Sequence, residues 1–286
     1  MSQVIKVITD SVCDIPPEVA AALDITQVPA VVNIGAQSYL DDGVQLTREE
    51  FYRRLPMLRE LPTTSGCPLG LVEQAIRARA AEADHLILIT APAQFSHIYS
   101  TFRTAAEALV PGRYTLIDSH QITMGEGFLV LAAAEGAANG VPLAEIVAHL
   151  EDMRARIHIF GVLSTLDNLR KSGRVGWIAA LAGTLLNIKP VLELTQGEVD
   201  RLALVRSHKQ ALKRLVEIVS DHAPLERLAV LHTDYPVGAQ RLLDQLADLM
   251  PPQHEVLAVN LNPALGTHLA RAGLGVALLT ERKRTR

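Results

Sequence analysis

Residues 4–23 read VIKVITDSVCDIPPEVAAAL, the order of a strand, a polar turn and a helix. Val4–Ile8 is a short β-branched run, and Pro17–Leu23 has the pattern of a helix that begins at proline. Further strands of this kind are expected at Val28–Ile34, Leu86–Ile89 and Tyr114–Ile117, with helices at Arg48–Leu58, Leu69–Ala83, Tyr99–Leu109, Met124–Asn139 and Leu143–Ile157. This alternation predicts βαβ units and therefore an α/β fold with a mostly parallel sheet flanked by helices.

The second half of the chain predicts a sheet of mixed direction. Pro190–Leu194 and Leu202–Val205 flank Gln196-Gly197-Glu198, which indicates an antiparallel hairpin. Alternating elements then return, with helices at Gln210–His222 and Val237–Met250 and strands at Leu228–Leu231, Glu255–Val259 and Val276–Leu279. The composition changes after a strand at Phe160–Leu163, so we predict two α/β domains, residues 1–159 and residues 160–286.

Composition and charge exclude several classes of protein. The chain has 286 residues, of which 49% are hydrophobic and only 4% aromatic, so a packed core of aliphatic side chains is expected instead of an aromatic-rich β-sandwich. A net charge of −4 provides no general attraction for nucleic acid. Two cysteines, Cys13 and Cys67, are too few for a disulfide framework or a four-cysteine zinc site, and no metal or cofactor is expected.

The expected location is the cytoplasm. The start MSQVIKVITD lacks the basic and apolar regions of a signal peptide. The longest apolar runs, such as Phe128–Ala134 and Trp177–Leu186, are shorter than the roughly 20 residues that cross a bilayer, so no integral membrane segment is expected.

Four loops rich in hydroxyl groups follow predicted strands. They are Thr9-Asp10-Ser11, Thr63-Thr64-Ser65-Gly66, Gln94-Phe95-Ser96 and Asp118-Ser119-His120. Parallel strands place such loops at one edge of a sheet, where open α/β folds bind ligands. Each loop alone is explained as well by helix capping, although three consecutive hydroxyls exceed what a cap needs. Residues 61–76 contain no Lys or Arg, which favours a carboxylate ligand over a nucleotide.

Sequence signatures of catalysis are absent. There is no Walker A lysine, no Gly-x-Ser-x-Gly elbow and no spaced metal ligands. His268 lies in a loop flanked by glycines and is explained either as a donor to an anion or as a structural residue. Arg174, between Gly173 and Gly176, is explained either as a guanidinium presented by a tight turn or as a charge at a helix C-terminus. The residues leave three functions open: a carrier, a hydrolase or phosphotransferase using Asp10, Ser11, Asp118 and His268 in a polar interdomain cleft, and a small-molecule sensor.

Five motifs in order resemble the DegV family over nearly the whole chain. They are Thr9-Asp10-Ser11-x-x-Asp14-Ile15-Pro16, Pro62-Thr-Thr-Ser65, Asp118-Ser119 with Met124-Gly125-x-Gly127, Leu169-Arg-Lys-Ser-Gly-Arg174 and Ile188-Lys-Pro190. That family is similar to the fatty-acid-binding subunits of bacterial fatty acid kinase. The resemblance implies a non-catalytic carrier that holds a long-chain fatty acid between two α/β domains and presents its carboxyl group to a separate kinase subunit.

Carried over by position, the resemblance also implies a set of site residues. Thr64, with Thr63 and Ser65 nearby, would contact the carboxyl group of the fatty acid, together with Ser96 and His268, and Arg174 would contact the kinase partner. The chain departs from the family in two loops: Pro92–Tyr99 replaces Ser-Ser-x-Leu-Ser-Gly-Thr-Tyr, and Leu269–Ala272 replaces Thr-Gly-Pro-Gly.

The energetics of an acyl ligand agree with this interpretation. Burying about fourteen methylenes at ~0.8 kcal/mol each gives on the order of 10 kcal/mol before the entropic cost of binding. Hydroxyl contacts, at about 1 kcal/mol each, would select and orient the head group. The apolar run Ile178–Leu186 is a candidate lining for the chain of the acid.

Overall fold

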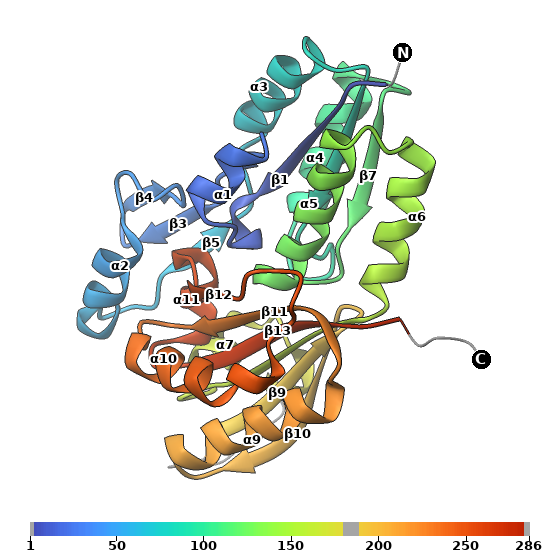
Figure 1. The fold of residues 1–286 in the computed structure, drawn as a ribbon. Coiled ribbons are helices and arrows are strands. Elements are labelled where there is room, and N and C mark those ends of the chain that lie inside the picture. Colours follow the sequence, from blue (N-terminus) through green and yellow to red (C-terminus); the bar gives the residue numbers. More distant parts are fainter. Residues whose placement is uncertain (1–2, 180–188, 283–286) are drawn as a thin grey trace. The chain divides into compact units, whose positions relative to one another are not determined.

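The computed structural model describes residues 3–179 and 189–282 (Figure 1). Most of the apolar run Ile178–Leu186 therefore lies outside the described residues. Internal contacts divide the chain into two compact units: unit 1 comprises Met1–Thr47 and Pro62–Ala155, and unit 2 comprises Arg48–Leu61 and Arg156–Arg286. A single boundary after residue 159 does not account for residues 48–61, which belong to unit 2 although they lie within the sequence of unit 1. The domain limits stay a prediction.

Unit 1 is built on the expected parallel sheet. Four strands lie in the order β2-β1-β6-β7, and every neighbouring pair is parallel. Their bounds are β1 (Ile5–Asp10), β2 (Thr26–Val28), β6 (His85–Thr90) and β7 (Tyr114–Asp118). All six residues of β6 are buried, as expected for a central strand covered on both faces.

Helices flank this sheet and confirm the predicted α/β class (Figure 1). They are α1 (Pro17–Ala22), α3 (Leu69–Ala80), α4 (Ile98–Leu109), α5 (Thr123–Ala138) and α6 (Leu143–Arg154), and a short 3₁₀ helix, η1 (Ser11–Cys13), follows β1. α3 and α4 pack on each other and on the sheet, whereas α5 packs on β1, β6 and α6. Twelve consecutive residues of α5, from Thr123 to Ala134, are buried.

Close packing explains one glycine of the Met124-Gly125-x-Gly127 motif. A Cβ atom added to Gly127 would lie 2.9 Å from the carbonyl oxygen of Cys13. A side chain there would force α5 away from the turn that follows β1.

A small antiparallel sheet in unit 1 corrects two predictions. Its order is β4-β3-β5, with bounds β3 (Val31–Ile34), β4 (Gln37–Leu40) and β5 (Thr63–Ser65). The single strand predicted at Val28–Ile34 is wrong, because Pro29 has no N–H for a ladder and separates β2 from β3. The loop predicted at Thr63–Ser65 is also wrong, since these residues pair with β3.

Unit 2 contains the predicted mixed sheet, in the order β10-β9-β8-β13-β11-β12. Its strands are β8 (Ile157–Val162), β9 (Lys189–Thr195), β10 (Glu198–Val205), β11 (Leu225–His232), β12 (Leu257–Asn260) and β13 (Leu274–Thr280). β11 and β12 are parallel, and the other neighbouring pairs are antiparallel. The predicted hairpin is confirmed, with Gln196 at φ 48° and Gly197 at φ 84° in its turn. The helix predicted to run to Ile157 stops at Arg154, because Ile157 begins β8.

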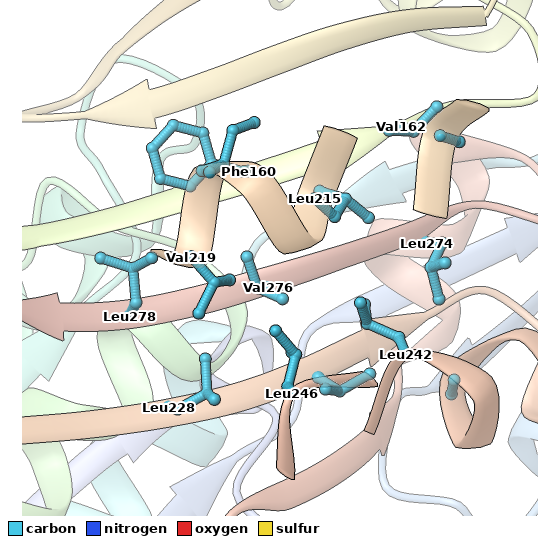
Figure 2. Packing of buried hydrophobic residues seen from close by; sticks show 14 of the residues in the cluster. Phe160, Val162, Leu215, Val219, Leu228, Leu242, Leu246, Leu274, Val276 and Leu278 are labelled. Carbon is cyan, nitrogen blue, oxygen red and sulfur yellow. The ribbon is translucent and has the colours of Figure 1, made fainter. Parts of the chain in front are cut away.

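Two helices cover one face of this sheet with aliphatic side chains. α9 (His208–His222) and α10 (Pro236–Gln245) pack their apolar stripes on β8, β11 and β13. Figure 2 shows Leu215 and Val219 of α9 and Leu242 of α10 against Val276 and Leu228. A separate apolar cluster includes α7 (Asp167–Ser172) and α8 (Gly176–Ala179), through residues such as Leu169 and Ile178.

The excursion of residues 48–61 belongs to unit 2 because its aromatic side chains are buried there. It forms α2 (Arg48–Arg54) and the 3₁₀ helix η2 (Leu55–Met57), which contains Pro56. The Tyr52 hydroxyl donates to the Leu261 carbonyl over 3.0 Å. A Cβ atom on Gly266, in α11 (Pro263–Leu269), would lie 2.5 Å from the Tyr52 hydroxyl oxygen, so only glycine fits there.

Candidate functional site

The Thr9-Asp10-Ser11 motif lies at the carboxyl end of β1 and forms hydrogen bonds to neighbouring loops. Asp10 is fully buried, and its carboxylate accepts the backbone N–H groups of Val12 and Ala91, each over 2.9 Å. The Ser11 hydroxyl accepts the Ala30 N–H over 3.1 Å and donates to the Asp41 carboxylate over 3.1 Å. The motif therefore joins the end of β1 to the end of β6 and to the segment that leads into β3.

The three hydroxyls of β5 alternate between the two faces of the small sheet. The Asn33 side-chain amide donates to the hydroxyls of Thr63 over 3.4 Å and Ser65 over 3.3 Å, so these two share one face with Asn33. Thr64, paired with Val32, points to the opposite face because side chains alternate along a strand. Strand geometry thus separates Thr64 from its two neighbours.

Ser96 closes a turn after β6. The N–H groups of Phe95 and Ser96 donate to the Pro92 carbonyl over 3.0 and 3.1 Å, and the Ser96 hydroxyl accepts the Ile98 N–H over 3.2 Å. Ser96, which precedes the N-cap residue His97, therefore satisfies the first N–H group of α4. Because a hydroxyl carries a donor as well as acceptor positions, this bond leaves its O–H able to donate to a ligand.

The β5 loop and the Ser96 loop meet at Gly66. A Cβ atom on Gly66 would lie 3.2 Å from Ile98 Cγ1 and 3.5 Å from the Ile98 nitrogen, the same N–H group that Ser96 caps. Residues more than thirty positions apart in the sequence are thereby brought together within unit 1.

The loop after β7 uses its polar groups on itself and on the Ser96 loop. The Asp118 carboxylate accepts the N–H groups of His120 over 3.0 Å and Ala93 over 3.1 Å. The Ser119 hydroxyl donates to the Gln121 carbonyl over 2.8 Å. These bonds shape loops, as do those of Asp10 and Ser11.

Unit 2 brings together the other two predicted site residues. His268 lies in the last turn of α11, and Arg174 follows the positive-φ Gly173 that ends α7. Burial, with a contribution from nearby Arg174, lowers the pKa of His268 to about 4. The imidazole is therefore neutral near pH 7. The side-chain amide of Asn168 donates to the Thr267 carbonyl over 2.9 Å and links α7 to α11.

The loop after His268 keeps a glycine-like backbone without glycine. Ala270 has φ 60° with ψ −172°, and Ala272 has φ 59°. These are conformations that side-chain-bearing residues rarely adopt. Arg271 between them forms an ion pair with Asp234, and its carbonyl accepts the Ser164 hydroxyl. The charge of Arg271 is thus directed to Asp234.

Sequence reasoning missed Glu126, the one acidic residue in the buried turns of α5. It is fully buried and accepts the Thr9 hydroxyl over 3.1 Å, and its carboxyl group interacts with that of Asp10. Burial raises the pKa of Glu126 well above its ordinary value and that of Asp10 to about 6. An acidic residue among Met124–Ala134, an otherwise apolar helix, is the signal in the sequence that points to it.

Two kinds of feature do not occur in the part of the chain that the structure describes. Residues 3–179 and 189–282 contain no group of three His, Cys, Asp or Glu side chains placed to hold a metal ion. None of the helices within these ranges is long and apolar enough to span a membrane.

Comparisons with known proteins agree on one family. The family model described as "Uncharacterised protein, DegV family" matches residues 4–281. A DegV domain-containing protein from Deinococcus radiodurans is 35% identical, covering 96% of this chain and 98% of the relative. Another from Streptomyces coelicolor is 32% identical and covers 97% and 99%.

Solved structures of similar proteins have the same fold. A DegV family protein from Thermus thermophilus, described with fatty acid binding, has a TM-score of 0.89 at 27% identity, covering 97% of this chain and 99% of that chain. DegV from Bacillus subtilis, described as a fatty acid binding protein, has a TM-score of 0.86 at 26% identity, covering 98% and 100%.

Proposed function

This chain belongs to the DegV family, and from that premise we propose that it binds a long-chain fatty acid as a non-catalytic carrier. The observation that carries the proposal is the meeting of the Thr64 strand and the Ser96 loop at Gly66. Two hydroxyls suit a single carboxylate, which needs hydrogen-bond donors and little countercharge, and residues 61–76 around Thr64 contain no Lys or Arg. The similar proteins from Thermus thermophilus and Bacillus subtilis are described as fatty acid binding, which supports this ligand.

Within this proposal the site residues have different roles. Thr64 and Ser96 donate to the carboxyl group of the fatty acid. Thr63 and Ser65 lie on the opposite face of β5 from Thr64 and support that strand through Asn33. His268, neutral near pH 7, carries one ring N–H, and we propose that it donates to the fatty acid.

The hydrolase or phosphotransferase alternative is not proposed. It depends on Asp10, Ser11 and Asp118 acting on a substrate, and each of the three already accepts a backbone N–H group that fixes a loop. Nothing in the fold favours the sensor alternative over the carrier. We also propose that the carrier acts in the cytoplasm, without nucleic acid as a partner.

The first test is extraction of the bound lipid. Protein purified without added lipid is denatured in organic solvent, and the extract is analysed by mass spectrometry. We expect one long-chain fatty acid per chain, because burial of a saturated chain provides on the order of 10 kcal/mol before entropic costs. An empty extract, together with no binding of added palmitate by calorimetry, would contradict the proposal.

We further propose that Arg174 contacts a separate kinase subunit that phosphorylates the presented carboxyl group. Its guanidinium is exposed and held by the Ser172 carbonyl over 2.7 Å at the end of α7. Arg174→Ala is expected to retain the fatty acid and to reduce acyl phosphate formation by the kinase at least tenfold. Arg170→Ala, four residues earlier in α7, is the matched control and should not change the rate. Equal rates for both variants would show that Arg174 is not the contact.

A further inference from the structure

A buried pair of carboxyl groups lies beneath the proposed site in unit 1. Asp10 ends β1, Glu126 comes from α5, and both side chains are fully buried. The two carboxyl groups lie close enough to interact, and burial raises the pKa of both. Two ionised carboxylates in contact inside a protein would be strongly destabilising, so the pair holds one proton and one negative charge.

The contacts place the proton on Glu126 and the charge on Asp10. Asp10 accepts two backbone N–H groups, which stabilise an ionised carboxylate. Glu126 accepts only the Thr9 hydroxyl on Oε1, and within residues 3–179 and 189–282 its Oε2 meets no donor, as expected for an oxygen that carries the proton. Among neighbouring titratable groups, Asp14 also raises the pKa of Glu126, and the pair in turn raises the pKa of the Cys13 and Cys67 thiols.

The charge on Asp10 fixes the turn that carries Ser96. Its Oδ2 accepts the Ala91 N–H, and the next residue, Pro92, accepts the N–H of Ser96 over 3.1 Å. Ser96 in turn accepts the Ile98 N–H, against which Gly66 packs. Hydrogen bonds, the Ala91–Pro92 peptide link and the packing of Gly66 on Ile98 therefore connect Asp10 to the point where the two ligand loops meet.

We propose that Asp10 is a positioning residue for the Ser96 hydroxyl, and that Glu126 orients Asp10 by donating its proton to it. The inference rests on the proposed function, because it names the residues that orient the Ser96 hydroxyl toward the carboxyl group of the fatty acid. Neither carboxyl group touches the fatty acid. Their effect on affinity is exerted through the backbone of residues 91–96.

The first experiment measures the dissociation constant of palmitate for Asp10→Asn. An amide has one acceptor oxygen and cannot hold both N–H groups, so binding at pH 7.5 is expected to weaken about tenfold. Protonation of Asp10 should weaken palmitate binding by the wild-type protein in the same way. The dissociation constant of Asp10→Asn should therefore exceed that of wild type by less than about threefold at pH 5. Asp84→Asn is the matched control, because Asp84 also accepts one backbone N–H, from Val4, before β6 begins.

A second variant separates orientation from charge. Glu126→Gln keeps a donor toward Asp10 and an acceptor for Thr9, so palmitate binding is expected within threefold of wild type. A loss as large as that of Asp10→Asn would contradict the role given to Glu126. Unchanged binding by Asp10→Asn at pH 7.5 would overturn the proposal.

Hydrogen exchange of the ligand-free protein tests the same idea without any fatty acid. In Asp10→Asn, amides of residues 91–98 should exchange at least tenfold faster, while those of β11 in unit 2 stay as in wild type. If wild type does not bind palmitate but this local change occurs, the proposed function fails and the positioning role survives. If palmitate binds and residues 91–98 exchange as in wild type, the positioning role fails alone.

Discussion

The Thr64→Ala/Ser96→Ala double variant is expected to bind palmitate about 100-fold more weakly than the wild-type protein. Each hydroxyl that donates to a charged carboxylate contributes about 1.5 kcal/mol, so loss of both corresponds to about 3 kcal/mol of binding free energy. Titration calorimetry at pH 7.5 measures the change directly. The acyl chain still binds, because its burial does not depend on these two side chains.

The fold of the double variant should be nearly intact. Thr64 lies on a three-residue edge strand, and Ser96 gives up one capping bond, to the Ile98 N–H, worth about 1 kcal/mol. The melting temperature of the ligand-free form is therefore expected to fall by only about 2–4 °C. Ser100→Ala/Thr104→Ala is the matched control, since both hydroxyls donate to carbonyls of α4 and its preceding turn. A collapse of thermal stability, or palmitate binding within threefold of wild type, would show that the two hydroxyls are structural.

Local sequence patterns predicted most of the fold because each unit is built from short elements with clear periodicity. The parallel strands of unit 1 and the hairpin of unit 2 lie at the predicted places. The prediction was wrong where one residue interrupts a pattern, as Pro29 does between β2 and β3. It was also incomplete for residues 48–61, because the burial of Tyr52 against Gly266 depends on contacts more than 200 residues apart.

The sequence predicted which loops contain the candidate site, but it did not predict how their side chains are placed. A loop assignment for Thr63–Ser65 treats three hydroxyls as equivalent, whereas pairing with β3 separates Thr64 from the other two. Glu126 was not predicted as part of the site, because a helix pattern does not show which side chain packs beneath another loop. Its contact with Thr9 joins residues 117 positions apart.

The buried carboxyl pair should also make the stability of the ligand-free protein depend on pH. Burial raises the pKa of Asp10 from 3.8 to about 6, so the folded state binds a proton more readily than the unfolded state. The folded protein is then stabilised by acid: the contribution is most favourable below pH 3.8 and is lost as the pH rises through 6. At 1.36 kcal/mol per pH unit, the full difference is about 3 kcal/mol, of which about 2 kcal/mol is expected between pH 4.5 and pH 7.5.

A wild-type pH curve alone would hide this contribution. The pKa of His268 is lowered to about 4, so protonation favours the unfolded state and stability falls as the pH drops from 6.5 toward 4. This effect has the opposite sign and a similar size. The measurement is therefore the free energy of unfolding in urea of wild type minus that of Asp10→Asn, which cancels His268 because both proteins contain it.

The free energy of unfolding of wild type minus that of Asp10→Asn is expected to rise by about 2 kcal/mol when the pH is lowered from 7.5 to 4.5. Glu126→Gln should change in the same direction, because burial raises the pKa of Glu126 as well and glutamine has no proton to bind. If both differences stay constant across this range, neither carboxyl group titrates differently in the folded and unfolded states. The shared proton, and with it the reason for Asp10 to hold the Ser96 turn as a carboxylate, would then be lost.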